Sequence, residues 1–308
     1  MPADQLRFDG RVAVITGAGR GVGSHYARLL AARGAAVVVN DLGVAADGSG
    51  FSREPAQAVV DEIRDAGGRA GANSGDVSVR ADAEALIEQA HDEFGRLDIL
   101  IHNAGVVNGT FEQLTAVNLA AAHWLTGAAW ARMHEQRYGR ILLTTSSAGM
   151  FGAANGPGYS PIESYGATKM GALGLGRCLA VRGRGSNINV NLISPSAATR
   201  LVDGLERTRG IQWIVDHARP ELVAPAAAYL VHESCEQSGQ VFAVGSGRVA
   251  RVFLGETTGY INPHLTPEDV ATHLDQICDE TGYHVPADMN ALAELYMETV
   301  ERALSNVN

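Results

Sequence analysis

The chain has 308 residues, of which 46% are hydrophobic, and a formal net charge of −10. This length can bury a full core, and the acidic balance without any Lys/Arg run argues against a nucleic-acid or membrane-surface partner. The three cysteines are scattered and form no CxxC pair, so we expect free thiols in a reducing compartment.

Neither a metal centre nor a membrane segment is expected. The ten histidines show no HExxH or similar ligand spacing, and no apolar stretch approaches the roughly 18 residues of a membrane span. The first residues lead straight into a strand pattern, without the charged and apolar regions of a signal peptide. These observations predict a cytoplasmic protein.

Short β-rich runs alternate with helical patterns over the first two thirds of the chain. The strands have near-continuous apolar character, and each is joined to the next by a helix, which predicts a parallel sheet covered on both faces. Right-handed crossovers make this a doubly wound α/β sheet of the Rossmann type. In chain order, the predicted elements are strand 11–16, helix 23–34, strand 35–41, helix 55–68, a third strand ending at 75–77, helix 79–95, strand 97–105, helix 114–137, strand 140–147, helix 163–182 and strand 188–194.

Residues 238–247 are predicted to form the final strand. The residues beyond it show helical patterns at 266–278 and 288–304, and no linker rich in Pro, Ser or charge separates them from the sheet. We therefore expect one Rossmann-fold domain over residues 1–247, with residues 248–308 as a C-terminal helical extension of the same domain.

A glycine-rich turn lies between the first predicted strand and the first helix. The stretch "TGAGRGVG" places glycines at 17, 19, 21 and 23, where they let the backbone approach a pyrophosphate at the helix N-terminus. The second strand ends at Asp41, whose carboxylate can accept hydrogen bonds from an adenosine ribose diol and would repel a 2′-phosphate. This pattern favours NAD over NADP, although the guanidinium of Arg20 could meet a phosphate.

Two further strand ends carry small or polar residues suited to a flat nucleotide, at residues 75–77 and 102–105. Each could be an ordinary loop on its own. Ligands of doubly wound sheets lie outside the carboxyl ends of the strands, so four such ends together predict dinucleotide binding.

Lys169 is the only lysine in the chain, and it follows Tyr165 by four residues. On a helix this spacing places both side chains on one face, where a surface pair is the usual alternative. A tyrosine acting as acid or base near neutral pH needs its pKa lowered by roughly 3 units from ~10. A compact ammonium nearby could supply that effect and also donate to a ribose hydroxyl, which a broad guanidinium does poorly.

These residues together resemble the short-chain dehydrogenase/reductase family over residues 10–247, because TGxxxGxG, the strand-end Asp, NAG, Ser and YxxxK occur in the family's order. The resemblance implies that Ser146 holds the substrate oxygen, Tyr165 transfers the proton and Lys169 binds the nicotinamide ribose and polarises Tyr165. It also implies that Asn118 positions a water that relays the proton. Asp76 and Val77 would contact the adenine, and Pro195 and Thr199 would reach the nicotinamide amide. The other implied cofactor contacts are Gly17, Arg20, Gly21, Val22, Gly23, Asp41, Leu42, Asn103, Ala104, Gly105, Tyr165 and Lys169.

A narrower likeness is to the (3R)-hydroxyacyl-CoA dehydrogenase unit of multifunctional enzyme type 2 and its bacterial relatives. It implies NAD-dependent oxidation or reduction of a 3-hydroxyacyl-CoA-like substrate. Basic residues at the mouth would support such a substrate, and Arg200, Arg207 and Arg209 are candidates, with a solvated helix face as the alternative reading. We also expect a homodimer or homotetramer. A hydroxysteroid or other bulky secondary alcohol is an alternative substrate, and a non-catalytic NAD-binding sensor is an alternative of another class. The ending "SNVN" is not a peroxisomal address, which favours the cytosol.

Two segments depart from the family pattern. The segment from Ser146 to Tyr165 is longer than usual, so Tyr159 lies nearer the standard distance, but Glu163 follows it where the motif needs a lysine. The segment from Asn103 to Asn118 is shorter than usual. We therefore expect altered walls of the substrate pocket around a retained catalytic set.

Overall fold

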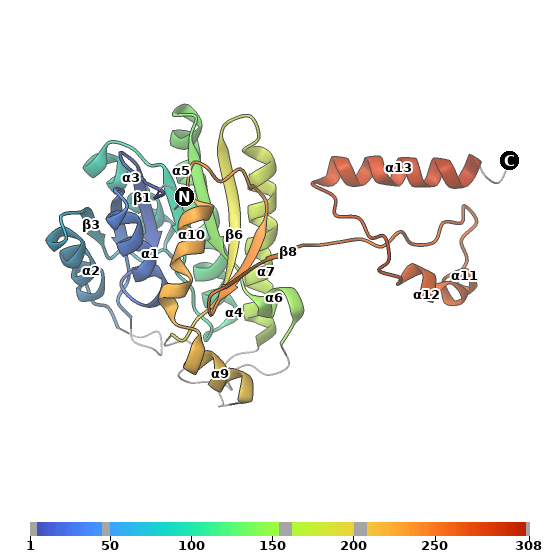
Figure 1. Cartoon of the computed structure of the whole chain (residues 1–308), viewed down its shortest axis with the longest axis horizontal. Coiled ribbons are helices and arrows are strands. Elements are labelled where there is room, and N and C mark those ends of the chain that lie inside the picture. Colours follow the sequence, from blue (N-terminus) through green and yellow to red (C-terminus); the bar gives the residue numbers. More distant parts are fainter. Residues whose placement is uncertain (1–4, 45–49, 154–161, 200–207, 306–308) are drawn as a thin grey trace. The chain divides into compact units, whose positions relative to one another are not determined.

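The computed structural model describes residues 5–44, 50–153, 162–199 and 208–305 (Figure 1). Its first unit contains an eight-stranded sheet with the order β3-β2-β1-β4-β5-β6-β7-β8, and every pairing from β3 across to β7 is parallel. This confirms the predicted doubly wound sheet. The strands are β1 (Val12–Thr16), β2 (Ala36–Asn40), β3 (Arg69–Asn73), β4 (Ile99–His102), β5 (Gly139–Thr144), β6 (Ile188–Ser196), β7 (Val241–Gly245) and β8 (Arg248–Val252).

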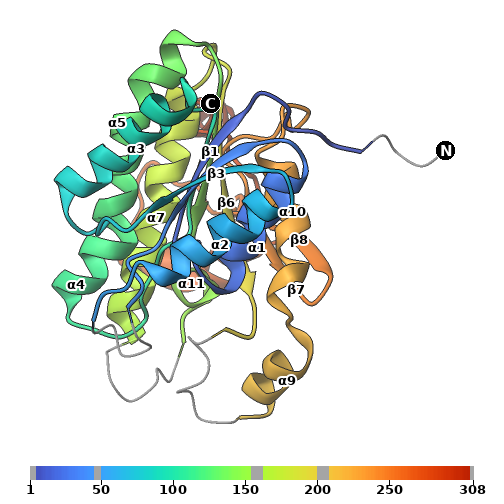
Figure 2. The same cartoon turned by 90° about the vertical axis from the view of Figure 1, so that its left-hand side faces the viewer.

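Helices cover both faces of this sheet. Figure 2 shows α1 (Gly21–Ala32), α2 (Glu54–Asp65) and α10 (Ala224–Leu230) on one side, and α3 (Arg80–Phe94), α5 (Ala121–Glu135) and α7 (Ile162–Arg182) on the other. Every residue of β1, β2, β4 and β5 is buried between these layers, which explains their unbroken apolar runs. Shorter helices are α4 (Phe111–Thr115), the π-helix η1 (Ala116–Ala120), α6 (Ser147–Phe151), α9 (Arg209–His217) and the 3₁₀-helix η2 (Pro220–Leu222).

The strand order reverses between β1 and β4, because β2 and β3 extend the sheet to one side of β1 and the later strands extend it to the other. In an open α/β sheet the helices that follow two such strands lie on opposite faces, which leaves a crevice outside the carboxyl ends of the strands. The glycine turn follows β1, and residues 103–105 follow β4. The fold therefore brings two of the predicted cofactor segments to this crevice.

The structure differs from the predicted elements in several places. The helix predicted at 114–137 is interrupted by the π-helical turn η1, and the third strand ends at Asn73 rather than at 75–77. The strand predicted as final is followed by β8. Ser246 and Gly247 join the two strands with φ of 51° and 78°, the backbone of a tight hairpin turn.

The residues after the sheet form a second compact unit, Val252–Asn308, separate from Met1–Arg251. It contains α11 (Pro267–Thr272), α12 (Leu274–Ile277) and α13 (Met289–Ser305), so the helix predicted at 266–278 is two short helices. No residue between 252 and 302 is buried. That this segment belongs to the same domain as the sheet stays a prediction. No helix of the described ranges has the length and hydropathy needed to cross a membrane.

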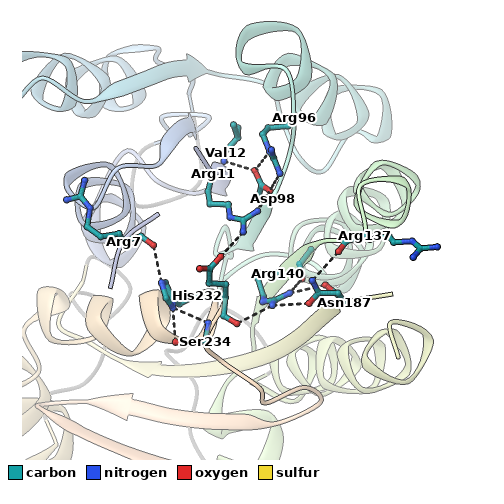
Figure 3. A network of polar contacts seen from close by, with 12 residues as sticks. Arg7, Arg11, Val12, Arg96, Asp98, Arg137, Arg140, Asn187, His232 and Ser234 are labelled. Atoms are coloured by element: carbon teal, nitrogen blue, oxygen red, sulfur yellow. Dashed lines mark hydrogen bonds and ion pairs between the residues drawn. The ribbon is translucent and has the colours of Figure 1, made fainter. Parts of the chain in front are cut away.

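A buried carboxylate holds the amino ends of β1 and β4 together, at the edge of the sheet opposite the crevice (Figure 3). Asp98 accepts hydrogen bonds from Arg96 at 2.6 and 2.7 Å, from Arg11 at 3.2 Å and from the backbone N–H of Val12 at 2.9 Å. Its side chain is completely buried. A buried charge is tolerated when it is paired and hydrogen-bonded in this way.

We expect the substitution Asp98→Asn to lower the free energy of unfolding by about 3 kcal/mol, because it leaves two guanidinium groups facing a neutral amide. Urea denaturation of both proteins measures this change. Asp9→Asn is the matched control, since Asp9 pairs with Arg7 at the exposed surface and its loss is expected to be undetectable. Equal midpoints for the wild type and the Asp98 variant would contradict the assigned role.

Candidate active site

The glycine turn after β1 has no room for side chains. A Cβ atom on Gly17 would lie 2.8 Å from the Cα of Ala104, and one on Gly23 would lie 2.3 Å from the carbonyl oxygen of Gly17. Gly17 and Gly21 also have φ of 62° and 53°, a conformation that favours glycine. The turn is therefore packed tightly against residue 104, which follows β4.

The N-terminus of α1 opens into the crevice without a side-chain cap. Arg20 is the residue before the helix, and its side chain makes no capping hydrogen bond. The first N–H groups of the helix, beginning at Gly21, are therefore available to an anion at the positive end of the helix dipole. Val22 is buried beneath the turn and packs into the core.

Asp41 lies beside the turn, directly after β2. Its Oδ2 accepts a hydrogen bond from the backbone N–H of Gly19 at 2.9 Å, and its Oδ1 accepts one from Gly43 at 2.8 Å. Both oxygens keep a second lone pair for a ligand. The half-buried Leu42 follows, and the exposed Arg20 donates to the carbonyl of Val44 at 3.1 Å.

Asn103 joins the ends of β4 and β1. Its side-chain amide donates to the carbonyls of Thr16 at 3.1 Å and Gly17 at 2.9 Å. The Thr16 hydroxyl in turn accepts from the backbone N–H groups of Asn103 and Ala104, at 3.1 and 3.0 Å. Sequence reasoning misses Thr16, although it is the first residue of the stretch TGAGRGVG. It fixes the floor on which Ala104 and Gly105 lie.

The remaining predicted cofactor residues lie at the ends of two strands, β3 and β6. Asp76 follows β3 and accepts from the N–H of Ser78 at 2.9 Å, while the adjoining Val77 is buried. Pro195 is the penultimate residue of the long strand β6. A Cβ on Gly21 would lie 3.4 Å from Cγ2 of Thr199, so the segment after β6 meets the glycine turn.

Tyr165 and Lys169 project from α7 at the same end of the sheet. Lys169 is 2% exposed, and its Nζ donates to the carbonyl of Thr144 at 3.2 Å and lies 5.9 Å from the ring centroid of Tyr165. Ser146 follows β5 and lies close enough to Tyr165 for its side chain to lower the pKa of the phenol. The structure thus brings Ser146, Tyr165 and Lys169 together, whereas a merely superficial Tyr–Lys pair would leave the lysine exposed.

The pKa of Tyr165 differs from the expectation drawn from the Tyr–Lys spacing. Burial raises the pKa of the phenol, and the hydrogen bond with Ser146, rather than the charge of Lys169, opposes that rise. Burial also lowers the pKa of Lys169 to about 8, since no carboxylate of the described residues compensates its charge. The expected lowering of the tyrosine pKa is therefore not a property of these side chains alone.

Asn118 occupies the π-helical turn η1 and is completely buried. Its amide donates to the carbonyl of Val106 at 2.9 Å and to the Thr168 hydroxyl at 3.2 Å, and its oxygen accepts from the N–H of Val106 at 3.0 Å. Single π-turns are common at functional sites. Because both amide hydrogens are engaged, the side chain can bind a water only through its oxygen.

Gly105 lies close to two of these groups, where a side chain would be crowded. A Cβ at this position would lie 3.1 Å from both the Asn118 oxygen and the Lys169 nitrogen. The predicted catalytic residues therefore adjoin the segment Asn103–Gly105. Tyr159, Arg200 and Arg207 lie outside the described residues, and Arg209 is exposed at the start of α9.

The glycine turn, the N-terminus of α1 and Asp41 together fit a dinucleotide. Close-packed glycines, uncapped N–H groups and the strand-end carboxylate of Asp41 match a pyrophosphate and an adenosine ribose, and the Lys169 nitrogen lies near Gly105, which follows β4.

Comparison with known proteins agrees with this geometry. The family model described as short chain dehydrogenase matches residues 11–208. Peroxisomal multifunctional enzyme type 2 of Mus musculus is 40% identical over 297 residues, which cover 92% of this chain and 39% of that protein. The chain thus spans less than half of this relative.

Two solved structures extend the comparison. Full-length peroxisomal multifunctional enzyme type 2 of Drosophila melanogaster matches with a TM-score of 0.77 at 31% identity, over 96% of this chain and 50% of that one. A 7α-hydroxysteroid dehydrogenase solved with NADH and 7-oxo glycochenodeoxycholic acid matches with a TM-score of 0.70 at 30% identity, over 80% and 97%. Both resemblances drawn from the sequence are confirmed, and the chain belongs to the short-chain dehydrogenase family of oxidoreductases.

Proposed function

We propose that the protein is an NAD-dependent dehydrogenase that interconverts a secondary alcohol and a ketone. The observation that carries this proposal is the burial of Lys169 beside Tyr165 and the cofactor floor, with no carboxylate partner among the described residues. A buried, unpaired ammonium is costly for folding, and strongly perturbed groups of this kind cluster at functional sites. The non-catalytic sensor offers no reason for such an arrangement.

The bound nicotinamide would supply hydride transfer, and the protein's own groups would handle the proton and the oxygen. Ser146 would donate a hydrogen bond to the substrate oxygen, and Tyr165 would exchange the proton with it. Lys169 would hold the nicotinamide ribose, and its charge would favour the ionised phenol once water is excluded. The oxygen of Asn118 would hold a water that carries the proton away from Lys169.

A 3-hydroxyacyl-CoA-like molecule is the proposed substrate, supported by the likeness over 92% of the chain to a peroxisomal multifunctional enzyme. The match to a 7α-hydroxysteroid dehydrogenase favours a hydroxysteroid as the second candidate. NADH formation with a panel of 3-hydroxyacyl-CoA thioesters and hydroxysteroids separates them. NAD binding without turnover on any panel member would favour the sensor.

NAD rather than NADP is proposed because Asp41 lies where the adenosine ribose would bind, with Arg20 beside it. We expect Asp41→Ser to lower the kcat/KM for NAD about tenfold and to raise that for NADP, since the carboxylate no longer repels the 2′-phosphate. Initial rates with each cofactor measure both changes. Asp61→Ser on the exposed face of α2 is the control, and an unchanged cofactor ratio in the Asp41 variant would contradict the placement.

The proposed assembly is a homodimer or homotetramer. The Val252–Asn308 unit exposes large apolar side chains, including Leu265, Met289 and Met297, at 55%, 75% and 57%. A monomer rarely exposes so many, so a second copy is the proposed cover. Sedimentation of the full chain tests this, and a monomer at micromolar concentration would contradict it.

A further inference from the structure

His102 is a buried titratable residue to which the proposed reaction assigns no role. It is the last residue of β4, directly before the segment Asn103–Gly105 on the cofactor floor, and its exposed fraction is 0%. Neither ring nitrogen has a hydrogen-bond partner of normal geometry. Buried polar atoms are nearly always paired with protein or with ordered water, so an orphaned imidazole beside an active site needs an explanation.

Lys169 is the charged side chain that acts on this imidazole. Burial, and then the charge of Lys169, lowers the pKa of His102 to about 3, so the ring is neutral at any physiological pH. The carbonyl of Val117, in the π-turn, favours a proton on the ring. A neutral imidazole has one nitrogen that carries a hydrogen and one that carries a lone pair. If the N–H points to the Val117 carbonyl, the other nitrogen is free to accept a hydrogen bond.

Among the described residues, Lys169 is the one charged group that shifts the pKa of His102. The parallel register places Leu143 of β5 beside it, and the other titratable group of the site is Tyr165, one turn before Lys169 on α7. The ammonium has three donors, of which one reaches the Thr144 carbonyl. His102 pairs with Leu143 in the sheet, and Lys169 donates to the carbonyl of the next residue, Thr144. An ammonium with unused donors and an imidazole with an unused lone pair therefore lie at the same end of neighbouring strands.

We propose that His102 is a positioning residue, which accepts a hydrogen bond from a water bridging it to Lys169 and so holds the ammonium toward the cofactor. This inference rests on the proposed function for its catalytic consequence, but the contact itself does not require turnover. Lys169 would then have acceptors on two sides, with the Thr144 carbonyl on one and the bridged imidazole on the other. The arrangement stabilises the charged form of a lysine that burial alone disfavours.

The single lysine of the chain makes this contact directly measurable. Protein labelled with [¹³Cε]lysine gives one side-chain resonance, whose pH titration reports Lys169 without cofactor or substrate. We expect His102→Leu to lower the pKa of Lys169 by about one unit or more, because a hydrogen bond to a charged group is lost. His102→Asn or His102→Gln, which keep an acceptor in place of Nδ1 or Nε2, should restore a value near that of the wild type.

The same variants separate this role from a structural one. The Leu variant should lose about tenfold in kcat/KM while its midpoint of thermal unfolding stays unchanged or rises, because an orphaned polar ring is removed. If the Leu variant does not fold, His102→Met serves as the apolar variant in its place. An unchanged lysine pKa in the apolar variants, or a lowered pKa that neither Asn nor Gln restores, would overturn the proposal. Failure of the proposed function is a different result, namely a wild type that turns over no substrate.

Discussion

Replacing Tyr165 with Phe is expected to reduce kcat by a factor of about 10³, while the affinity for NAD changes little. In the proposed reaction the phenol oxygen exchanges a proton with the substrate, and general acid–base catalysis contributes roughly 10²–10⁴ to the rate. The ring itself remains packed on α7, and the variant loses only the hydrogen bond with Ser146. Steady-state rates, with NADH binding followed by fluorescence, separate the two effects.

Tyr229→Phe is the matched control for this substitution. Tyr229 lies on α10, on the other face of the sheet, and is 45% exposed. Its variant should retain wild-type rates. If the Tyr165 variant kept more than a tenth of the wild-type kcat, another group would have to transfer the proton, and the proposed chemistry would be wrong.

Replacing Lys169 with Met is expected to abolish turnover and at the same time to stabilise the fold at neutral pH. The difference between a pKa of about 8 in the folded protein and 10.5 in an exposed lysine corresponds to a burial cost of about 3 kcal/mol. Loss of the hydrogen bond to the Thr144 carbonyl offsets part of the gain, so we expect a net increase of about 2 kcal/mol in the free energy of unfolding. Urea denaturation measures it.

The gain should also depend on pH in a defined direction. Below pH 8 both folded and unfolded wild type hold the lysine proton, and the full cost of burial is present. Between pH 8 and 10.5 the folded protein releases the proton and the unfolded chain keeps it, so wild-type stability rises with pH. The difference between variant and wild type is therefore largest below pH 8 and shrinks above it. A Met variant less stable than wild type at pH 7 would contradict the assigned cost.

Lys169→Arg distinguishes charge from shape at this position. Arginine keeps the positive charge, but its planar fork is larger than the ammonium and is not deprotonated. In a site where the lysine is 2% exposed, we expect the Arg variant to be inactive and destabilised. A variant with wild-type activity would show that charge alone is required.

Much of this site could be predicted because its residues fall where one-dimensional patterns are informative. The glycines of the turn, Asp41 and Asn103 all follow apolar strands, and parallel strands bring their carboxyl ends to one edge. The four-residue spacing of Tyr165 and Lys169 needs only a helix to become a contact. Local spacing and strand order are enough for these positions.

Other features depend on contacts that leave no pattern in the sequence. The acceptor for Lys169 is the backbone carbonyl of Thr144, and any residue type carries a carbonyl. The π-turn at Asn118 is one residue inserted in a helical repeat, so hydrophobic periodicity hardly changes across it. Burial of the phenol, which reverses the expected direction of the Tyr165 pKa, requires the packed structure.

The proposed reaction requires the molecule's sole lysine to be buried beside the bound cofactor, and a titration of this lysine tests that placement. The lysine resonance of ¹³C-labelled wild-type protein should report a pKa of about 8 in the free protein and should shift when NAD is added. A pKa near 10.5 that NAD leaves unchanged would place the ammonium in solvent, away from the nucleotide, and would contradict the account.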